Sequence, residues 1–138
     1  IKSNKLFINL AVIALLSFSA ASCEKPEGKG GKATVTGKVY AYDFDNTQNY
    51  MLSKGYSADE RVYITYGTSN TIGDDVRTSA DGSFEFKYLN KGRYKIFVNS
   101  LDTSIKVKGN DSYKPVFREF EIKDAKQTIK LDDIIINK

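Results

Sequence analysis

The stretch that decides the fold is Thr78–Val98, TSADGSFEFKYLNKGRYKIFV. It contains Asp81-Gly82, a dipeptide that favours tight hairpin turns because both positions tolerate positive φ. Apolar and polar side chains then alternate through SFEFKYL, and a period of two is typical of a half-buried strand. The stretch therefore predicts two strands around Asp81-Gly82, the second of which points three aromatic side chains inward: Phe84, Phe86 and Tyr88.

A second turn at Asn90–Gly92 leads into RYKIFVNS, where Tyr94, Ile96 and Val98 share one face. Outward from here, strand-like runs lie at residues 33–42, 61–66, 115–122 and 127–136. These are six or seven short strands in about 105 residues, with turns between them and no convincing helix. The pattern predicts an all-β fold, a single antiparallel sandwich of six to seven strands.

The segment between the first two strands, residues 43–60, is longer than a hairpin requires. Long loops in compact domains are more often functional or mobile than accidental. Its first residues, DFDN at Asp43–Asn46, offer the oxygen ligands that calcium prefers, but the glycine and closing glutamate of an EF-hand loop are missing. We therefore interpret Asp43–Asn46 as a strand end that turns into a loop, and we predict no metal site.

Two parts of the sequence resemble the transthyretin-like (prealbumin-like) domains, the group that contains carboxypeptidase regulatory-like domains and Cna B-type repeats. The residues that carry the resemblance are Gly37, Val39, Asp81, Gly82, Phe84, Phe86, Leu89, Gly92, Tyr94, Ile96 and Val98. These are turn and core residues, so the motif is informative about the fold and almost silent about function. The resemblance implies a seven-stranded sandwich of a kind usually found in non-catalytic modules for adhesion, carbohydrate contact or docking.

The composition argues against catalysis, metal binding and nucleic-acid binding. The chain has 138 residues, a single cysteine and no histidine, which removes most zinc sites and the common nucleophile–histidine pairs. The formal charge is +4, and it falls to +2 without Lys2 and Lys5 of the first 22 residues. Charges of both signs are interspersed, without the basic stripe that nucleic-acid binding needs. We expect no enzyme activity and no cofactor.

The N-terminus reads as a targeting segment. Lys2 and Lys5 precede an apolar run at residues 6–20, which is short for a membrane-spanning helix but typical of a signal peptide. Small residues follow, and then Cys23, the one cysteine of the chain. This order resembles a bacterial lipobox, in which the peptidase cuts before a cysteine that carries diacylglycerol, as in Bacteroidetes-type lipoproteins. An ordinary signal peptide with a free Cys23 is the alternative.

The lipobox resemblance implies a signal peptide at residues 1–22 and a lipidated Cys23. A flexible tether is expected to follow up to residue 32, and the predicted sandwich occupies residues 33–138. Several acyl chains on one cysteine anchor a protein firmly. Glu24, in place of an aspartate at that position, implies the outer membrane; whether the domain faces the periplasm or the exterior stays open. The glycine-rich run EKPEGKGGK at residues 24–32 predicts the tether.

Five aromatic residues fall on the strand faces opposite the predicted core: Tyr40, Tyr42, Tyr63, Phe97 and Phe117. Exposed rings stack on sugars and anchor protein interfaces. They also pair across strands and stabilise the sheet, and this alternative stays open. The sequence thus predicts a lipid-anchored module without catalysis that binds an envelope protein partner, with carbohydrate binding through these aromatic residues as the alternative.

Overall fold

The computed structural model describes residues 23–105 and 111–138. The signal peptide predicted at residues 1–22 lies outside these ranges. The described residues form nine strands and no helix: β1 (Lys29–Phe44), β2 (Met51–Tyr56), β3 (Arg61–Tyr66), β4 (Ile72–Arg77), β5 (Ser83–Leu89), β6 (Gly92–Leu101), β7 (Tyr113–Ile122), β8 (Thr128–Lys130) and β9 (Ile134–Asn137). The all-β prediction is confirmed.

The strand number of six to seven is wrong for two local reasons. The segment 43–60, read as a loop, contains β2, which pairs with residues 40–44 at the end of β1. The run 127–136, read as one strand, is divided into β8 and β9 by residues 131–133. Both short strands lie beside β1 and run parallel to it, so the sandwich is antiparallel only in its larger part.

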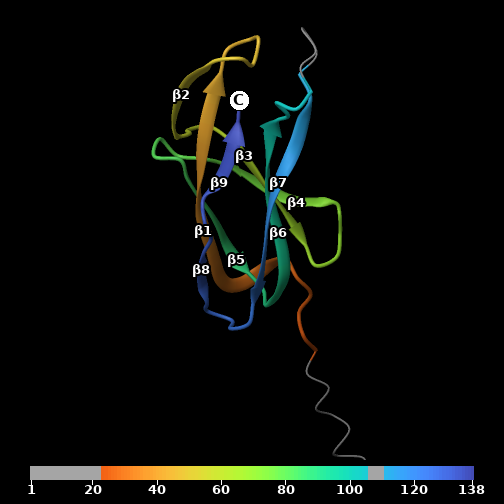
Figure 1. The fold of residues 1–138 in the computed structure, drawn as a ribbon. Helices are drawn as coiled ribbons and strands as arrows, with labels where there is room; N and C mark the ends of the chain where they lie inside the picture. The colour runs from red at the N-terminus through yellow and green to blue at the C-terminus, as the bar shows by residue number, and fades with distance from the viewer. Residues whose placement is uncertain (1–22, 106–110) are drawn as a thin grey trace, which may run out of the picture.

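The strands form two sheets that pack face to face (Figure 1). In the first sheet β1 is central: it pairs antiparallel with β2 and β5, and parallel with β8 and β9. The second sheet has the order β4-β3-β6-β7 and is antiparallel throughout. Because β1 is 16 residues long, it serves as the common neighbour of four other strands.

The core lies between the sheets, and the period-two patterns select its residues. Every second residue of β1 from Ala33 to Ala41 is buried, as is every second residue of β6 from Tyr94 to Val98. The largest side chains that are almost fully enclosed come from both sheets: Ile64, Leu89, Ile96, Ile122, Ile134 and Ile136. Alternation thus predicted the buried face of these strands correctly.

The turn at Asp81-Gly82 corrects the hairpin prediction. Gly82 has a φ of 76°, and its N–H donates to the Ser79 carbonyl at 2.9 Å, so the turn itself forms. However, β4 pairs with β3 and β5 pairs with β1. The turn therefore carries the chain from one sheet to the other, because burial and not the turn decides which strands pair.

Tyr88 is a second correction, since the sequence predicted it to point inward. It is 67% exposed, and its φ of 61° interrupts the extended backbone of β5. Leu89 takes the inward place beside β1, where Lys29 and Ala33 both lie opposite it. Residues 30–32 of β1 bulge out of the sheet there. A second irregularity, where Ala33 and Val35 lie opposite Leu89 and Phe86, gives β5 one extra residue and shifts its alternation.

The beginning of β1 also differs from the sequence prediction. Lys29 already belongs to the strand, inside the segment predicted as a tether over residues 24–32. Gly31 lies in the bulge, where a Cβ would overlap the Leu89 carbonyl oxygen, so only glycine fits there without movement. The glycines that suggest flexibility therefore allow close approach of two backbones.

Candidate functional site

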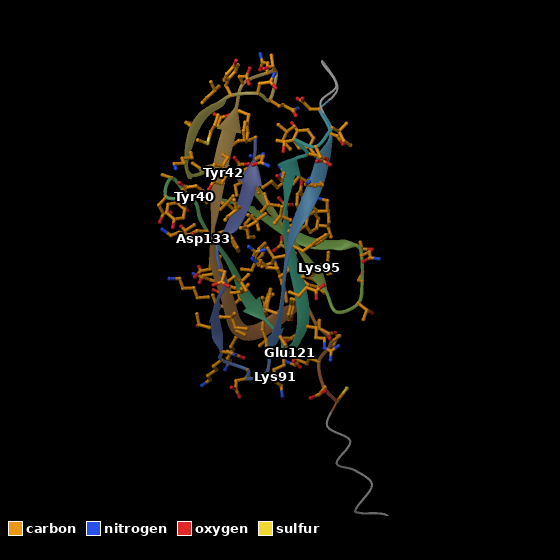
Figure 2. The ribbon with its side chains drawn as sticks, viewed as in Figure 1. Tyr40, Tyr42, Lys91, Lys95, Glu121 and Asp133 are labelled. Carbon is orange, nitrogen blue, oxygen red and sulfur yellow. The ribbon has the colours of Figure 1, made fainter. Side chains whose placement is uncertain are left out.

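The structure divides the five predicted aromatic residues between the two outer faces of the sandwich. Tyr40 and Tyr42 lie on β1, in the first sheet. Tyr63, Phe97 and Phe117 lie on β3, β6 and β7, in the second sheet. In Figure 2, Tyr40 and Tyr42 are on the left of the molecule, whereas Lys95, a neighbour of the second group, is on the right. A single aromatic platform is not formed.

The first group, which we call the β1 cluster, consists of Tyr40, Tyr42 and Tyr56. Tyr40 contacts the other two rings edge to face, at centroid distances of 5.6 and 5.4 Å. The Lys38 ammonium lies 4.7 Å from the centre of the Tyr56 ring. The Tyr56 hydroxyl donates to Asp133 at 3.0 Å, and this hydrogen bond raises the pKa of the phenol.

The second group, the β6 cluster, is a row of three rings in register across neighbouring strands: Tyr63, Phe97 and Phe117. Tyr63 and Phe97 are stacked at 4.9 Å with their planes 21° apart. Phe97 and Phe117 are tilted by 54° at 5.5 Å. The Lys95 ammonium lies 5.2 Å from the centre of the Phe117 ring.

In both clusters, faces of the rings are used within the molecule. A sugar stacks on the open face of an aromatic ring, whereas Tyr63 and Phe97 turn one face each to one another. Cations occupy one face of Tyr56 and one of Phe117. Apart from the Tyr40–Tyr42 contact within β1, the ring contacts join neighbouring strands, as in cross-strand pairs that stabilise a sheet. Tyr56 and Phe117 are the members that stay substantially exposed.

Three exposed apolar residues lie where the β1–β2 loop ends and β2 begins, and the sequence reasoning singled out neither Met51 nor Leu52 among them. Tyr50, Met51 and Leu52, which we call the tip, are consecutive and 72%, 51% and 66% exposed. Single exposed apolar residues are ordinary, whereas three in succession are a candidate contact surface. The sequence feature that could have revealed this surface is a run of three apolar residues, without alternation, inside the long segment 43–60.

The tip is held in place by one carboxylate. Asp45 accepts hydrogen bonds from the backbone N–H groups of Asn49 and Tyr50, both at 2.9 Å, and from the Thr47 hydroxyl at 2.5 Å. The Thr47 hydroxyl, followed by the backbone donors, lowers the pKa of Asp45 to about 2. The chain at Asp43–Asn46 thus ends β1 and turns into a loop, as the sequence predicted, and Asp45 orders that loop.

The opposite end of the molecule, the base, holds the segment that follows Cys23. The Gly28 N–H donates to the Tyr94 hydroxyl at 2.9 Å, and this hydroxyl donates to the Asn90 carbonyl at 2.7 Å. The Asn90 amide nitrogen donates to the Pro26 carbonyl at 2.9 Å. Tyr94 is 2% exposed, and burial raises the pKa of its phenol. The segment is thus docked on the sandwich from Pro26 onward.

The docked segment encloses a groove of about 850 Å³ at the base, together with the β5–β6 and β7–β8 turns. Lys91 and Glu121 mark its position at the lower end of the molecule in Figure 2. Its buried floor includes Leu89 and Ile122. Five lysines and three glutamates line it, an excess of two positive charges: Lys25, Lys32, Lys91, Lys123, Lys126, Glu24, Glu27 and Glu121.

Cys23 is exposed and lines the same groove. Over residues 23–105 and 111–138, no group of three or more metal-ligating side chains is assembled. Within the same ranges, no helix is long and apolar enough to cross a membrane.

Comparisons with known proteins give a limited result. No protein-family model matches the chain, and no curated protein matches it significantly. A crystal structure from Pseudomonas aeruginosa, described as a "putative carbohydrate binding protein", is similar with a TM-score of 0.48 and 10% sequence identity. The match covers 81% of this chain and 92% of that protein. At this TM-score, the likeness carries no inference about the ligand of this chain.

Proposed function

We propose that this chain is a lipid-anchored, non-catalytic binding module of the outer membrane, with a transthyretin-like sandwich that presents its tip to a protein partner in an envelope assembly. The observation that carries the proposal is the position of the tip. The connection between β1 and β2, to which the tip belongs, lies at the end of the sandwich opposite the one where the chain enters β1 (Figure 1). A module anchored at one end and apolar at the other is suited to hold a contact surface away from a membrane.

The order of the tip loop supports a binding role. A loop that is already ordered loses less conformational entropy when it binds than a mobile one. Asp45 supplies that order through its hydrogen bonds to the loop, while the three apolar side chains remain exposed. Tyrosine is enriched among the residues that contribute most to protein interfaces, and methionine is enriched in interface cores. A partner of fitting chemistry is a protein with an apolar pocket.

The lipid anchor is supported by the lipobox-like order of residues before Cys23 and by the exposure of its thiol. The transthyretin-like class is supported by the two-sheet architecture and by the inward positions of Phe84, Phe86 and Ile96.

Photo-crosslinking in the native envelope tests the proposed partner. A photoreactive phenylalanine analogue replaces Tyr50 in one variant and Tyr88, an equally exposed tyrosine near the base, in a matched control. We expect one discrete protein adduct from position 50 and no such adduct from position 88. Equal patterns from both positions, or no adduct from position 50, would contradict the role of the tip.

Metabolic labelling tests the anchor. A palmitate analogue should label the wild-type chain and should not label the Cys23→Ser variant. A chain whose label survives this substitution, or a wild-type chain without label, would exclude a lipid anchor at Cys23.

Carbohydrate binding through the aromatic clusters is the second candidate. It receives less support from the geometry, because ring faces in both clusters are turned to neighbouring rings or to lysines. The half-exposed rings of Tyr56 and Phe117 would have to carry it. Binding to a glycan array that is lost in both Tyr56→Ala and Phe117→Ala would favour this candidate over the protein partner.

A further inference from the structure

The groove at the base is built by a segment that cannot move freely away from the sandwich. Pro26 and Gly28 are hydrogen-bonded to Asn90 and Tyr94, and β1 begins at Lys29. Only Glu24 and Lys25 therefore separate Cys23 from the docked chain. At about 3.3–3.6 Å per extended residue, Cys23 and Pro26 are at most roughly 11 Å apart.

Because of this short separation, the groove would lie close to the membrane surface when Cys23 carries acyl chains. The headgroup region adds several ångströms to each side of the hydrocarbon core, and charges are screened over about 8–10 Å at physiological ionic strength. The base would then lie within the range of the lipid phosphates. A flexible tether of ten residues would not impose this proximity.

The charges of the groove are available for such a contact. Over the described ranges, no carboxylate lies within 4.0 Å of Lys25, Lys32, Lys123 or Lys126, and Lys91 meets Glu24 only at 4.0 Å. The turn that carries Lys123 and Lys126 is ordered, because the Gln127 side chain accepts from the Lys123 N–H at 2.9 Å. Four of the five groove lysines thus have no ion-pair partner among the described residues that an anionic ligand would have to displace.

We infer that the groove at the base binds the phosphate headgroups of anionic lipids in the membrane that holds Cys23. This inference rests on the proposed anchor and adds an orientation to it: the base faces the bilayer and the tip points away. From Ala33 to Phe44, β1 follows the long axis of the molecule and spans roughly 36 Å at about 3.3 Å per residue. The tip is accordingly held about this far from the headgroups.

Lysine footprinting of the lipidated protein tests the inference. The full protein is reconstituted in nanodiscs of phosphatidylglycerol and phosphatidylcholine in equal parts, and a water-soluble acylating reagent reports lysine accessibility by mass spectrometry. We expect Lys25, Lys32, Lys123 and Lys126 to react about fivefold more slowly than in detergent, since one basic residue near an anionic surface contributes about this factor. Lys54 and Lys114, near the tip, are the internal controls and should react equally in both.

Two comparisons make the result specific. In nanodiscs of phosphatidylcholine alone, the lysines at the base should regain most of their reactivity. Equal protection in both kinds of nanodisc would overturn headgroup binding, because closeness to any bilayer would then explain the protection. The double variant Lys123→Gln, Lys126→Gln should raise the reactivity of Lys25 and Lys32, whereas the matched variant Lys54→Gln, Lys114→Gln should not. An equal effect of the two variants would also overturn the inference.

Two further outcomes separate the sources of failure. Protection in detergent by inorganic phosphate at constant ionic strength would assign the groove to free phosphate and overturn the lipid assignment. A chain without acyl label at Cys23 would contradict the proposed anchor, whereas a labelled chain with unprotected lysines would contradict headgroup binding alone.

Discussion

The base is tied by a buried phenol, whereas the tip is tied by an exposed carboxylate. At the base, the Tyr94 hydroxyl bonds to Gly28 and Asn90 inside the protein. At the tip, Asp45 bonds to the loop in contact with solvent. Buried hydrogen bonds cost more to break than exposed ones, because a stranded polar group cannot recover its hydration. The base should therefore be a rigid part of the fold, while the tip should open locally and respond to pH.

The largest expected effect is a loss of stability when the bulge at the base is disrupted. Gly31→Ala places a methyl group against the Leu89 carbonyl, a backbone atom that cannot turn away, and we expect a loss of about 3 kcal/mol in the free energy of unfolding. Gly55→Ala, on β2, is the control, because a Cβ there meets no atom within 4 Å. It should be neutral or stabilising by up to about 1 kcal/mol. Urea denaturation measures both, and similar values for the two would refute the role of the bulge.

Tyr94→Phe should follow with a loss of about 2 kcal/mol, since it removes one hydroxyl and strands the Gly28 N–H and the Asn90 carbonyl. Hydrogen exchange at Gly28 should become faster while exchange in β6 stays slow. Tyr113→Phe removes an exposed hydroxyl and should change neither the stability nor the hydrogen exchange at Gly28. If Gly28 stays protected in Tyr94→Phe, the segment after Cys23 is held by other contacts.

Tyr88→Gly should stabilise the protein, by about 0.5–1 kcal/mol. Its φ of 61° is costly for a side chain with a Cβ, and its ring is exposed, so the relief of strain should exceed the added chain entropy of glycine. Tyr113→Gly, at an exposed strand position without positive φ, should destabilise. Thermal unfolding of the two variants gives the sign of each change in stability. If both variants are destabilised, the positive φ of Tyr88 is not a source of strain.

The smallest effect concerns pH and is confined to the tip. The folded pKa of Asp45, about 2, lies below its ordinary value of 3.8, so the ionised form stabilises the loop above pH 4. This contribution is lost as the pH falls from 4 towards 2. The pKa of Tyr94 is raised instead, so the base keeps its contribution up to pH 10 and loses it only above.

Amide exchange followed by NMR between pH 4 and pH 2 measures the difference between the two ends. The Tyr50 amide should lose protection over this interval, and Gly28 should keep it. Asp45→Asn should loosen Tyr50 at every pH. Parallel loss at Tyr50 and Gly28 would mean that the whole sandwich, and not the tip loop, responds to acid.

The buried faces of the strands could be read from the sequence, because alternation depends on each strand alone. Val35, Val39 and Ile96 are buried as their spacing predicts. Strand partners could not be read in this way. The parallel pairing of β8 and β9 with β1 depends on residues almost a hundred positions away, and the turn at Asp81-Gly82 has the local chemistry of a hairpin but connects two sheets.

The candidate site shows the same limit. The outward direction of Tyr40 and Phe97 follows from alternation, but their separation onto two sheets follows from strand order. Tyr94 was expected inward as an apolar residue, yet its hydroxyl meets Gly28, 66 residues earlier in the chain. A glycine-rich segment reads as flexible when its partners are distant in sequence, and for this reason the docking of residues 26–28 was not foreseen.

The long strand β1 has a mechanical consequence. The chain enters β1 from the Cys23 side and leaves it towards the tip, so both proposed attachment points lie at the two ends of one strand. A pulling force between them would travel along the covalent backbone of β1. The hydrogen bonds to β2, β5, β8 and β9 would carry little of this load. A sandwich attached in this way would transmit tension without unfolding, whereas one attached through its two chain termini would have its sheets loaded in shear.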